Sequence, residues 1–166
     1  DQCPAHLRTN RSPLTRWFGR TFYRAIGWEL EGKIADAERV MVVAAPHTSN
    51  WDFVFGILVI LGINARVRWL GKHTIFKFGV TWFFRWLGGI PVNREQPDEV
   101  MGYVDAAVEK DNGLILVMAP EGTRKKVTKW KTGFLRIAKK NKCVIQLGAL
   151  DFANRRIVLG DVFEPT

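Results

Sequence analysis

Short apolar runs alternate with longer, partly polar segments along the chain. The runs VMVVAA at residues 40–45 and LILVM at residues 114–118 are apolar and short, which predicts buried strands. Other runs of the same kind predict further strands at residues 67–70, 90–92, 144–150 and 157–159.

The segments between these runs predict helices, at residues 52–61, 75–87, 97–110 and 133–140. Residues 52–61 are apolar nearly all round, so this helix is expected to be buried. Gly88 and Gly89 are expected to end the helix before them. Strands that alternate with helices predict an α/β fold, a single-domain sandwich in which helices flank a largely parallel mixed sheet.

Residues 14–26 predict an amphipathic helix with two contrasting faces. At 100° per residue, Arg16, Arg20 and Arg24 stack on one face. Such a helix is typical of a membrane interface, but the pattern also fits a terminal helix whose apolar face packs on the core. Gly19 weakens the helix in either case. The apolar face consists of Leu14, Trp17, Phe18, Phe22, Ala25 and Ile26.

The length of 166 residues suits one domain, and the charge balance is strongly basic. Lys and Arg exceed Asp and Glu by 25 to 16, which gives a formal net charge of +9. This charge favours polyanions, anionic lipid surfaces or phosphorylated small molecules, without choosing among them. The chain also has seven Trp and eleven Phe residues, and aromatic rings beside cations suit a water–lipid boundary.

The two cysteines, Cys3 and Cys143, are too few for a disulfide framework and lack the spacing of a metal site, so we expect a reducing compartment. No apolar stretch reaches the roughly 18–20 residues that span a bilayer. Residues 53–63 are too few, and Lys77 and Arg85 interrupt the later aromatic stretch. With no signal-peptide pattern at the start, we expect a peripheral or monotopic protein on the cytoplasmic face of a membrane.

The stretch PHTSNWD places His47 and Asp52 between two apolar runs. On one continuous helix these side chains point about 140° apart, so they meet only if a helix begins between them. Thr48, Ser49 and Asn50 are all suitable N-cap residues. A carboxylate in the first turn then orients the imidazole, and the positive helix end favours its neutral form, as a general base requires. The stretch alone also fits an ordinary loop histidine beside a helix-start acid.

The stretch APEGTRKK, residues 119–126, follows a predicted buried strand and indicates an anion site. Gly122 lets a ligand approach the backbone, while Thr123 and Arg124 supply hydrogen-bond donors. Arginine is the better candidate for a bidentate phosphate contact. A solvated basic turn is the alternative that this stretch leaves open.

In the stretch GGIPVNRE, residues 88–95, the paired glycines and the proline predict a tight turn into a short strand, with Arg94 at its end. Alone it fits a structural turn equally well. The phosphate-binding P-loop, the dinucleotide fingerprint and the G-x-S-x-G nucleophile elbow do not occur in the sequence, and neither does a convincing metal-ligand cluster. These absences argue against lipase-type hydrolases and dinucleotide-dependent enzymes.

Together these stretches resemble the glycerolipid acyltransferase family, in particular its 1-acyl-glycerol-3-phosphate and lysophospholipid acyltransferases. HTSNWD matches the H-x-x-x-x-D motif of that family, GGIPVNR its second block and PEGTR its third. KTGFLRIAKKNKCVIQLG resembles the segment that leads to the fourth block. The blocks occur in order over residues 40–150, which is far more specific than any block alone.

The resemblance implies transfer of a fatty acyl group from acyl-CoA or acyl carrier protein to a lipid hydroxyl, on a glycerol-3-phosphate acyltransferase-like fold. His47 would take the hydroxyl proton and Asp52 would orient His47, with no covalent acyl-enzyme, cofactor or metal. Candidate supporting residues are Ser49, Asn50 and Lys72. The acceptor's phosphate would be held by Arg94, Glu121, Gly122, Thr123 and Arg124.

We expect residues 1–30 to form a membrane-interfacial segment and residues 31–166 the acyltransferase domain. Expected partners are the acyl donor, a lysophospholipid and an anionic membrane surface. Nucleic acid is not expected, because no recognised nucleic-acid motif accompanies the high pI. Asn93 replaces a common acidic residue and Gln146 a usual proline of the family, which we expect to reshape the acceptor or acyl pocket. A lyso-ornithine lipid or glycolipid acceptor therefore stays open, as does a non-catalytic binder of anionic lipid.

Overall fold

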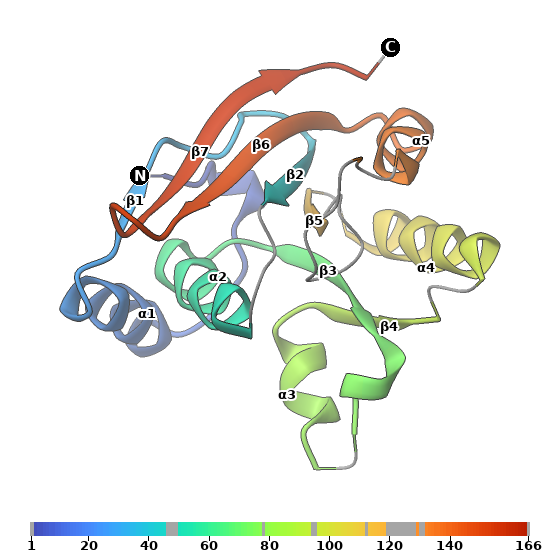
Figure 1. Cartoon of the computed structure of the whole chain (residues 1–166). Coiled ribbons are helices and arrows are strands. Elements are labelled where there is room, and N and C mark those ends of the chain that lie inside the picture. Colours follow the sequence, from blue (N-terminus) through green and yellow to red (C-terminus); the bar gives the residue numbers. More distant parts are fainter. Residues whose placement is uncertain are drawn as a thin grey trace.

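The computed structural model describes residues 2–45, 50–77, 79–93, 96–111, 113–118, 129 and 132–165; of residues 50–53 and 97 it describes the backbone. The described residues form one seven-stranded sheet in the order β1-β7-β6-β2-β5-β3-β4 (Figure 1). Every neighbouring pair is parallel except β6 and β7. The strands are β1 (Glu29–Glu31), β2 (Arg39–Ala45), β3 (Val67–Lys72), β4 (Gly89–Val92), β5 (Leu114–Met118), β6 (Val144–Asp151) and β7 (Arg156–Phe163).

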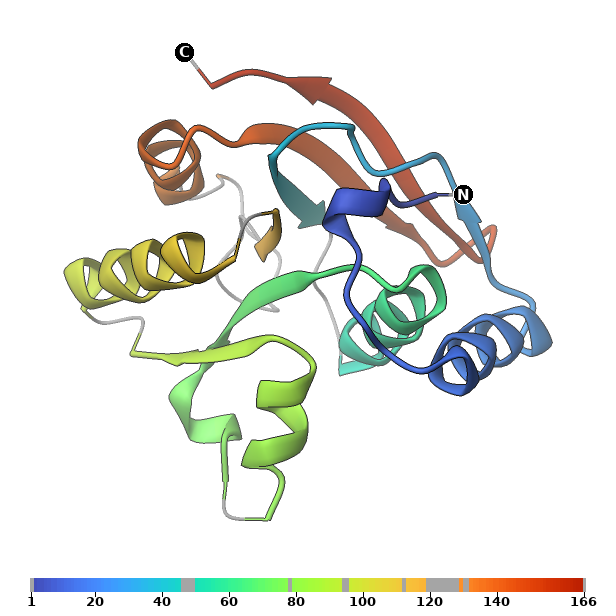
Figure 2. The same ribbon diagram turned by 180° about the vertical axis from the view of Figure 1, so that it is seen from behind.

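Helices cover both faces of the sheet, as Figures 1 and 2 show from opposite sides. The period of two along β2 explains this, because its successive side chains point to opposite faces. Val40 and Val42 join a buried cluster with residues of α2, whereas Met41 and Val43 join a second cluster with α4 and α5. The predicted α/β sandwich is thus confirmed. The helices are α1 (Pro13–Ala25), α2 (Asn50–Ile63), α3 (Thr81–Trp86), α4 (Pro97–Lys110) and α5 (Gly133–Lys140).

The predicted helix at residues 75–87 is wrong over its first half. The structure has a 3-10 turn at His73–Ile75, and α3 begins only at Thr81. Gly79 has a φ of +93°, a left-handed conformation that interrupts a right-handed helix. Phe76 packs instead beside Trp69 of β3, with ring centres 5.8 Å apart. Tertiary packing of an aromatic ring therefore shortens this helix.

Gly88 ends α3, as predicted, and its lack of a side chain is required there. Its φ is +90°, and a Cβ atom at this position would lie 1.8 Å from the carbonyl oxygen of Val67. The close approach allows the chain to turn directly from α3 into β4, which pairs with β3. The glycine thereby places the carboxyl end of β4 beside that of β3.

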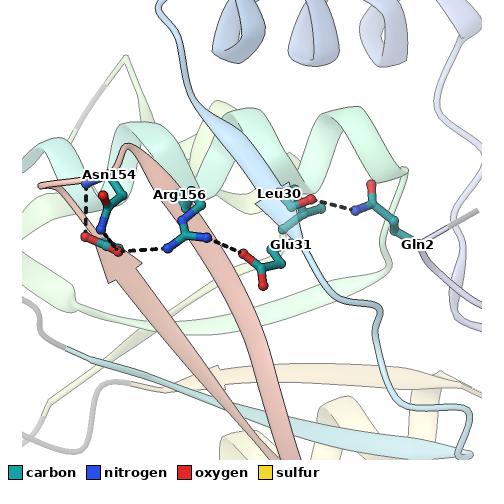
Figure 3. Close-up of polar contacts among 6 residues, drawn as sticks. Gln2, Leu30, Glu31, Asn154 and Arg156 are labelled. Atoms are coloured by element: carbon teal, nitrogen blue, oxygen red, sulfur yellow. Dashed lines mark hydrogen bonds and ion pairs between the residues drawn. The ribbon is translucent and has the colours of Figure 1, made fainter.

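The short edge strand β1, which the hydrophobic pattern did not predict, is held by polar contacts to β7 and to the N-terminal segment (Figure 3). The Arg156 guanidinium lies 2.9 Å from the Glu31 carboxylate and 3.7 Å from that of Asp151. The Gln2 amide donates a hydrogen bond to the Leu30 carbonyl at 3.0 Å. Because Leu30 and Glu31 are bound by Gln2 and Arg156, which are distant in sequence, no local pattern predicts the strand.

Candidate active site at one edge of the sheet

Four neighbouring strands end along the same edge of the sheet. β2, β5, β3 and β4 lie in this order and are all parallel, so their carboxyl ends point the same way. In the register of these strands, Val43 of β2 lies opposite Met118 of β5, and Lys72 of β3 lies opposite Val92 of β4. In open α/β sheets this edge is the usual place for a ligand site.

Each predicted motif includes or follows the end of one of these strands. β2 ends at Ala45, shortly before His47; β4 ends at Val92, shortly before Arg94; and β5 ends at Met118, directly before APEGTRKK. The topology thus brings the entry to all three motifs to one edge, although the motifs are far apart in sequence. The predicted residues that lie outside the described part of the chain are His47, Ser49, Arg94, Glu121, Gly122, Thr123 and Arg124.

The helix that the His47–Asp52 hypothesis requires begins where it was predicted. α2 starts at Asn50, so the backbone of Asp52 belongs to its first turn and His47 precedes the helix. The backbone N–H groups of a first turn have no partner within the helix and carry its positive dipole end. The local geometry on which the pairing depends is therefore present, while the contact between the two side chains stays a prediction.

Lys72, a candidate supporting residue, is the last residue of β3 and is exposed. It precedes the 3-10 turn at His73–Ile75 and lies at the same edge as the strand that leads to Arg94. Asn93, just beyond β4, is half-buried, and its carbonyl accepts a hydrogen bond from the Gln96 backbone N–H at 3.0 Å. The structure thus brings a cation to the edge where the sequence predicts an anion site.

Gln146, which was expected to reshape a substrate pocket, has a structural role in this fold. This residue of β6 is only 2% exposed, and its amide is occupied by a neighbouring segment. Its Nε2 donates to the Lys33 carbonyl at 2.7 Å, and its Oε1 accepts from the Ala35 N–H at 3.0 Å. Gln146 therefore ties the chain before β2 to the sheet.

The part of the chain that the structure describes holds no group of three or more His, Cys, Asp or Glu side chains suited to a metal ion. Both cysteines are buried, and desolvation raises the pKa of the Cys3 thiol and of the Cys143 thiol to about 11. A thiol with such a pKa is protonated at neutral pH and is a poor nucleophile. Neither cysteine is therefore a candidate for covalent catalysis.

α1 presents its apolar face to solvent, so the alternative in which this face packs on the core is wrong. Leu14 is 71% exposed and Trp17 62%, and the other residues of the predicted apolar face are exposed as well. Gly19 and Tyr23 are the buried residues of the helix. Among the helices that the structure describes, none is long and apolar enough to cross a bilayer.

Two arginines, Arg20 on the polar face of α1 and Arg11 just before the helix, explain why this side of α1 turns inward. Arg20 Nε donates to the Gly62 carbonyl at 2.7 Å, and Arg11 Nη1 donates to the Ala65 carbonyl at 2.9 Å. These carbonyls lie at or just beyond the C-terminal end of α2, where a helix leaves acceptors without partners and favours cations. The arginine contacts therefore satisfy the end of a buried helix and leave the aromatic face of α1 uncovered.

Comparisons with known proteins agree with this arrangement. A family model described as acyltransferase matches residues 28–146. A similar solved structure is that of the 1-acyl-sn-glycerophosphate acyltransferase PlsC from Thermotoga maritima, with 20% sequence identity and a TM-score of 0.65. The alignment covers 92% of this chain and 68% of that one. No match was found among curated proteins.

Proposed function

Because the chain belongs to the acyltransferase family, we propose that it transfers a fatty acyl group from acyl-CoA or acyl carrier protein to the hydroxyl of a lysophospholipid. The observation that supports this proposal is that the strands carrying or leading to the three motifs end at one edge of the sheet. H-x-x-x-x-D and PEGTR follow β2 and β5, and GGIPVNR contains β4; the carboxyl ends of these strands share one sheet edge. Acyl transfer requires the catalytic base, the residues that bind the acceptor and the acyl donor to lie close together, and one shared sheet edge allows this.

In the proposed mechanism His47 acts as general base. It removes the proton of the acceptor hydroxyl, and the oxygen attacks the thioester carbonyl carbon of the donor. The carbon–sulfur bond then breaks, and the departing thiolate takes the proton from the His47 imidazolium. Asp52, in the first turn of α2, orients the imidazole and stabilises its protonated form. No acyl group is attached to the protein at any step.

The acceptor's phosphate is the proposed partner of the second and third motifs. One arginine side chain can donate two parallel hydrogen bonds to phosphate oxygens. A glycine allows the phosphate to approach backbone N–H groups. The exposed ammonium group of Lys72 at the same edge adds positive charge near this site. In this proposal Ser49 and Asn50 support the start of α2. The phosphate is held by Arg94, Glu121, Gly122, Thr123 and Arg124.

The proposed enzyme works at the surface of a membrane, where its lipid substrates reside. The exposed aromatic face of α1 supports this location, because a helix with such a face lies in the interface between lipid headgroups and acyl chains. The same observation favours a second candidate function, a non-catalytic binder of anionic lipid. That candidate leaves the three motifs without a role.

An acceptor panel tests the proposal and separates the two candidates. Purified protein is mixed with oleoyl-CoA or palmitoyl-CoA and with lysophosphatidic acid, a lyso-ornithine lipid or a glycolipid, and release of free thiol is followed. We expect turnover with lysophosphatidic acid. Turnover with another acceptor alone would change the proposed substrate. No thiol release with any acceptor from either a CoA or a carrier-protein donor would favour the binder.

A further inference from the structure

A second group of uncovered aromatic side chains lies at the end of the molecule that carries α1. It belongs to residues 75–86 apart from residue 78, here called the aromatic segment, which includes α3. Trp82 is 69% exposed and Trp86 46%, values unusual for the largest apolar side chain. The other large apolar side chains that this segment exposes are Ile75, Val80 and Phe83.

The aromatic segment is anchored by a different set of rings. Phe76 and Phe84 pack against Trp69 of β3, with ring centres 5.8 and 6.1 Å from that of Trp69. The Trp69 indole N–H donates to the Leu87 carbonyl at 3.2 Å. Because the core side of the segment is already filled, the exposed rings are not core residues of this fold. They project into solvent from a segment that Phe76 and Phe84 hold against Trp69.

The aromatic segment and α1 are joined into one surface. The Arg11 guanidinium carbon, just before α1, lies 5.5 Å from the centre of the Trp86 ring at the end of α3. Figures 1 and 2 show α1 and α3 at the same lower side of the molecule, with α2 between them in both views. β6 and β7 lie at the opposite side. Two aromatic patches from separate elements therefore lie on the same side of the molecule.

The charge of these two regions has one sign. The sequence has no Asp or Glu between Gln2 and Trp28, and none between Phe53 and Arg94. A surface of this kind repels a second copy of itself and attracts an anionic surface. The exposed cations of α1 and of the aromatic segment are Arg24, Lys77 and Arg85.

We propose that the aromatic segment is a second membrane contact, which together with α1 seats this side of the protein on a bilayer that contains anionic lipid. Tryptophan favours the headgroup level of a bilayer, and Lys and Arg beside it reach the lipid phosphates. α1 alone would leave the protein free to tilt about the helix axis. A second contact on another element fixes the tilt. This inference concerns binding and does not depend on acyl transfer.

Site-specific fluorescent labelling tests the second contact. Cys3 and Cys143 are buried with raised pKa values, so a thiol-reactive, environment-sensitive dye at neutral pH labels an introduced cysteine. The variants are Trp82→Cys in the aromatic segment, Trp17→Cys in α1, and Phe163→Cys in β7 as control. Vesicles of phosphatidylcholine with phosphatidylglycerol are compared with pure phosphatidylcholine.

We expect the dye at residues 82 and 17 to shift to the blue on anionic vesicles, and the dye at residue 163 to stay unchanged. A shift at residue 17 without one at residue 82 would overturn the inference. A concentration-dependent shift at residue 82 without vesicles would instead identify a second copy of the chain as the partner, and would also overturn it.

Vesicle co-sedimentation of unlabelled protein gives a second measurement. Trp82→Gln should weaken partitioning into anionic vesicles about tenfold, because partitioning scales with the apolar area that enters the interface. Phe163→Gln, the same kind of change at an exposed ring on the opposite side, should leave it unchanged. Equal partitioning of the two variants would contradict the second contact. Vesicle binding without turnover would refute the proposed function and leave this inference intact.

Discussion

Gln146 links two backbone segments through one buried side chain. Its amide donates a hydrogen bond to the Lys33 carbonyl and accepts one from the Ala35 N–H. These two backbone groups of the segment before β2 thereby have a partner. A buried donor or acceptor that loses its partner destabilises the fold by its desolvation free energy. The glutamine that departs from the family pattern is thereby explained by packing.

Gln146→Leu should lower the free energy of unfolding by about 2 kcal/mol, since it leaves the Lys33 carbonyl and the Ala35 N–H without their partner. Chemical denaturation followed by circular dichroism measures this change. The matched control is Gln96→Leu, at an exposed glutamine, which should change stability little. Equal stabilities of the two variants would contradict the role of Gln146.

His47 is expected to be the residue whose loss abolishes catalysis with the fold intact. Loss of a general base lowers the rate by roughly 10²–10⁴, so His47→Ala should reduce kcat/KM for lysophosphatidic acid by that factor. His6→Gln, at an exposed histidine distant in sequence, is the control and should retain activity. Full activity of a folded His47→Ala variant would exclude the proposed mechanism.

At the scale of elements, α1 and α2 approach closely through two glycines. A Cβ atom on Gly19 would lie 2.7 Å from the Gly62 nitrogen and 2.7 Å from the Leu58 carbonyl oxygen. The backbone atoms of α2 cannot move away as a flexible side chain would. Gly19, which weakens α1 as an isolated helix, is thus required for its packing against α2.

Gly19→Ala should destabilise the protein by about 1–3 kcal/mol through this overlap, although alanine is about 1 kcal/mol better than glycine in a free helix. The sign of the change in the free energy of unfolding therefore shows whether packing against α2 or helix propensity has the larger effect. Thr21→Ala, at an exposed position of α1, provides the control and should be neutral or slightly stabilising. Thermal denaturation measures both variants, and a stabilised Gly19→Ala variant would contradict the close approach.

At the scale of the whole molecule, the buried thiols make the free energy of unfolding depend on pH in the alkaline range. Burial raises the pKa of Cys143 from 9.0 to about 11, so the folded state holds the proton more tightly than the unfolded state. The resulting stabilisation is fully present below about pH 9 and is lost as the pH rises towards 11. Cys3 behaves in the same way.

Removal of one thiol should therefore reduce the alkaline loss of stability. We expect the free energy of unfolding of Cys143→Ala to fall less steeply than that of the parent protein between about pH 9 and 11. Urea denaturation at several pH values within this window measures the two slopes. Identical slopes would indicate that the Cys143 thiol is accessible to water in the folded protein.

The sequence by itself determined the α/β class, most element bounds and the family. The bounds of α4, α5 and β5 agree with the prediction, because the pattern of apolar and polar positions is a local property of the chain. α2 starts at Asn50, between His47 and Asp52 as the sequence required, two residues before the predicted helix at residues 52–61. The motif residues around His47 were found by their spacing and order, which need no coordinates.

Only the tertiary structure decided which face of α1 is exposed to solvent and how long α3 is. The pattern of α1 fits a helix with its apolar face inward or outward. The choice depends on the distant carbonyls of Gly62 and Ala65, which Arg20 of α1 and Arg11 just before it bind. The shortening of α3 depends in the same way on the packing of Phe76 against Trp69. These contacts join residues far apart in sequence, so no local pattern contains them. The sequence therefore supplied the chemistry of the site, and the tertiary contacts supplied the orientation of the surface that surrounds it.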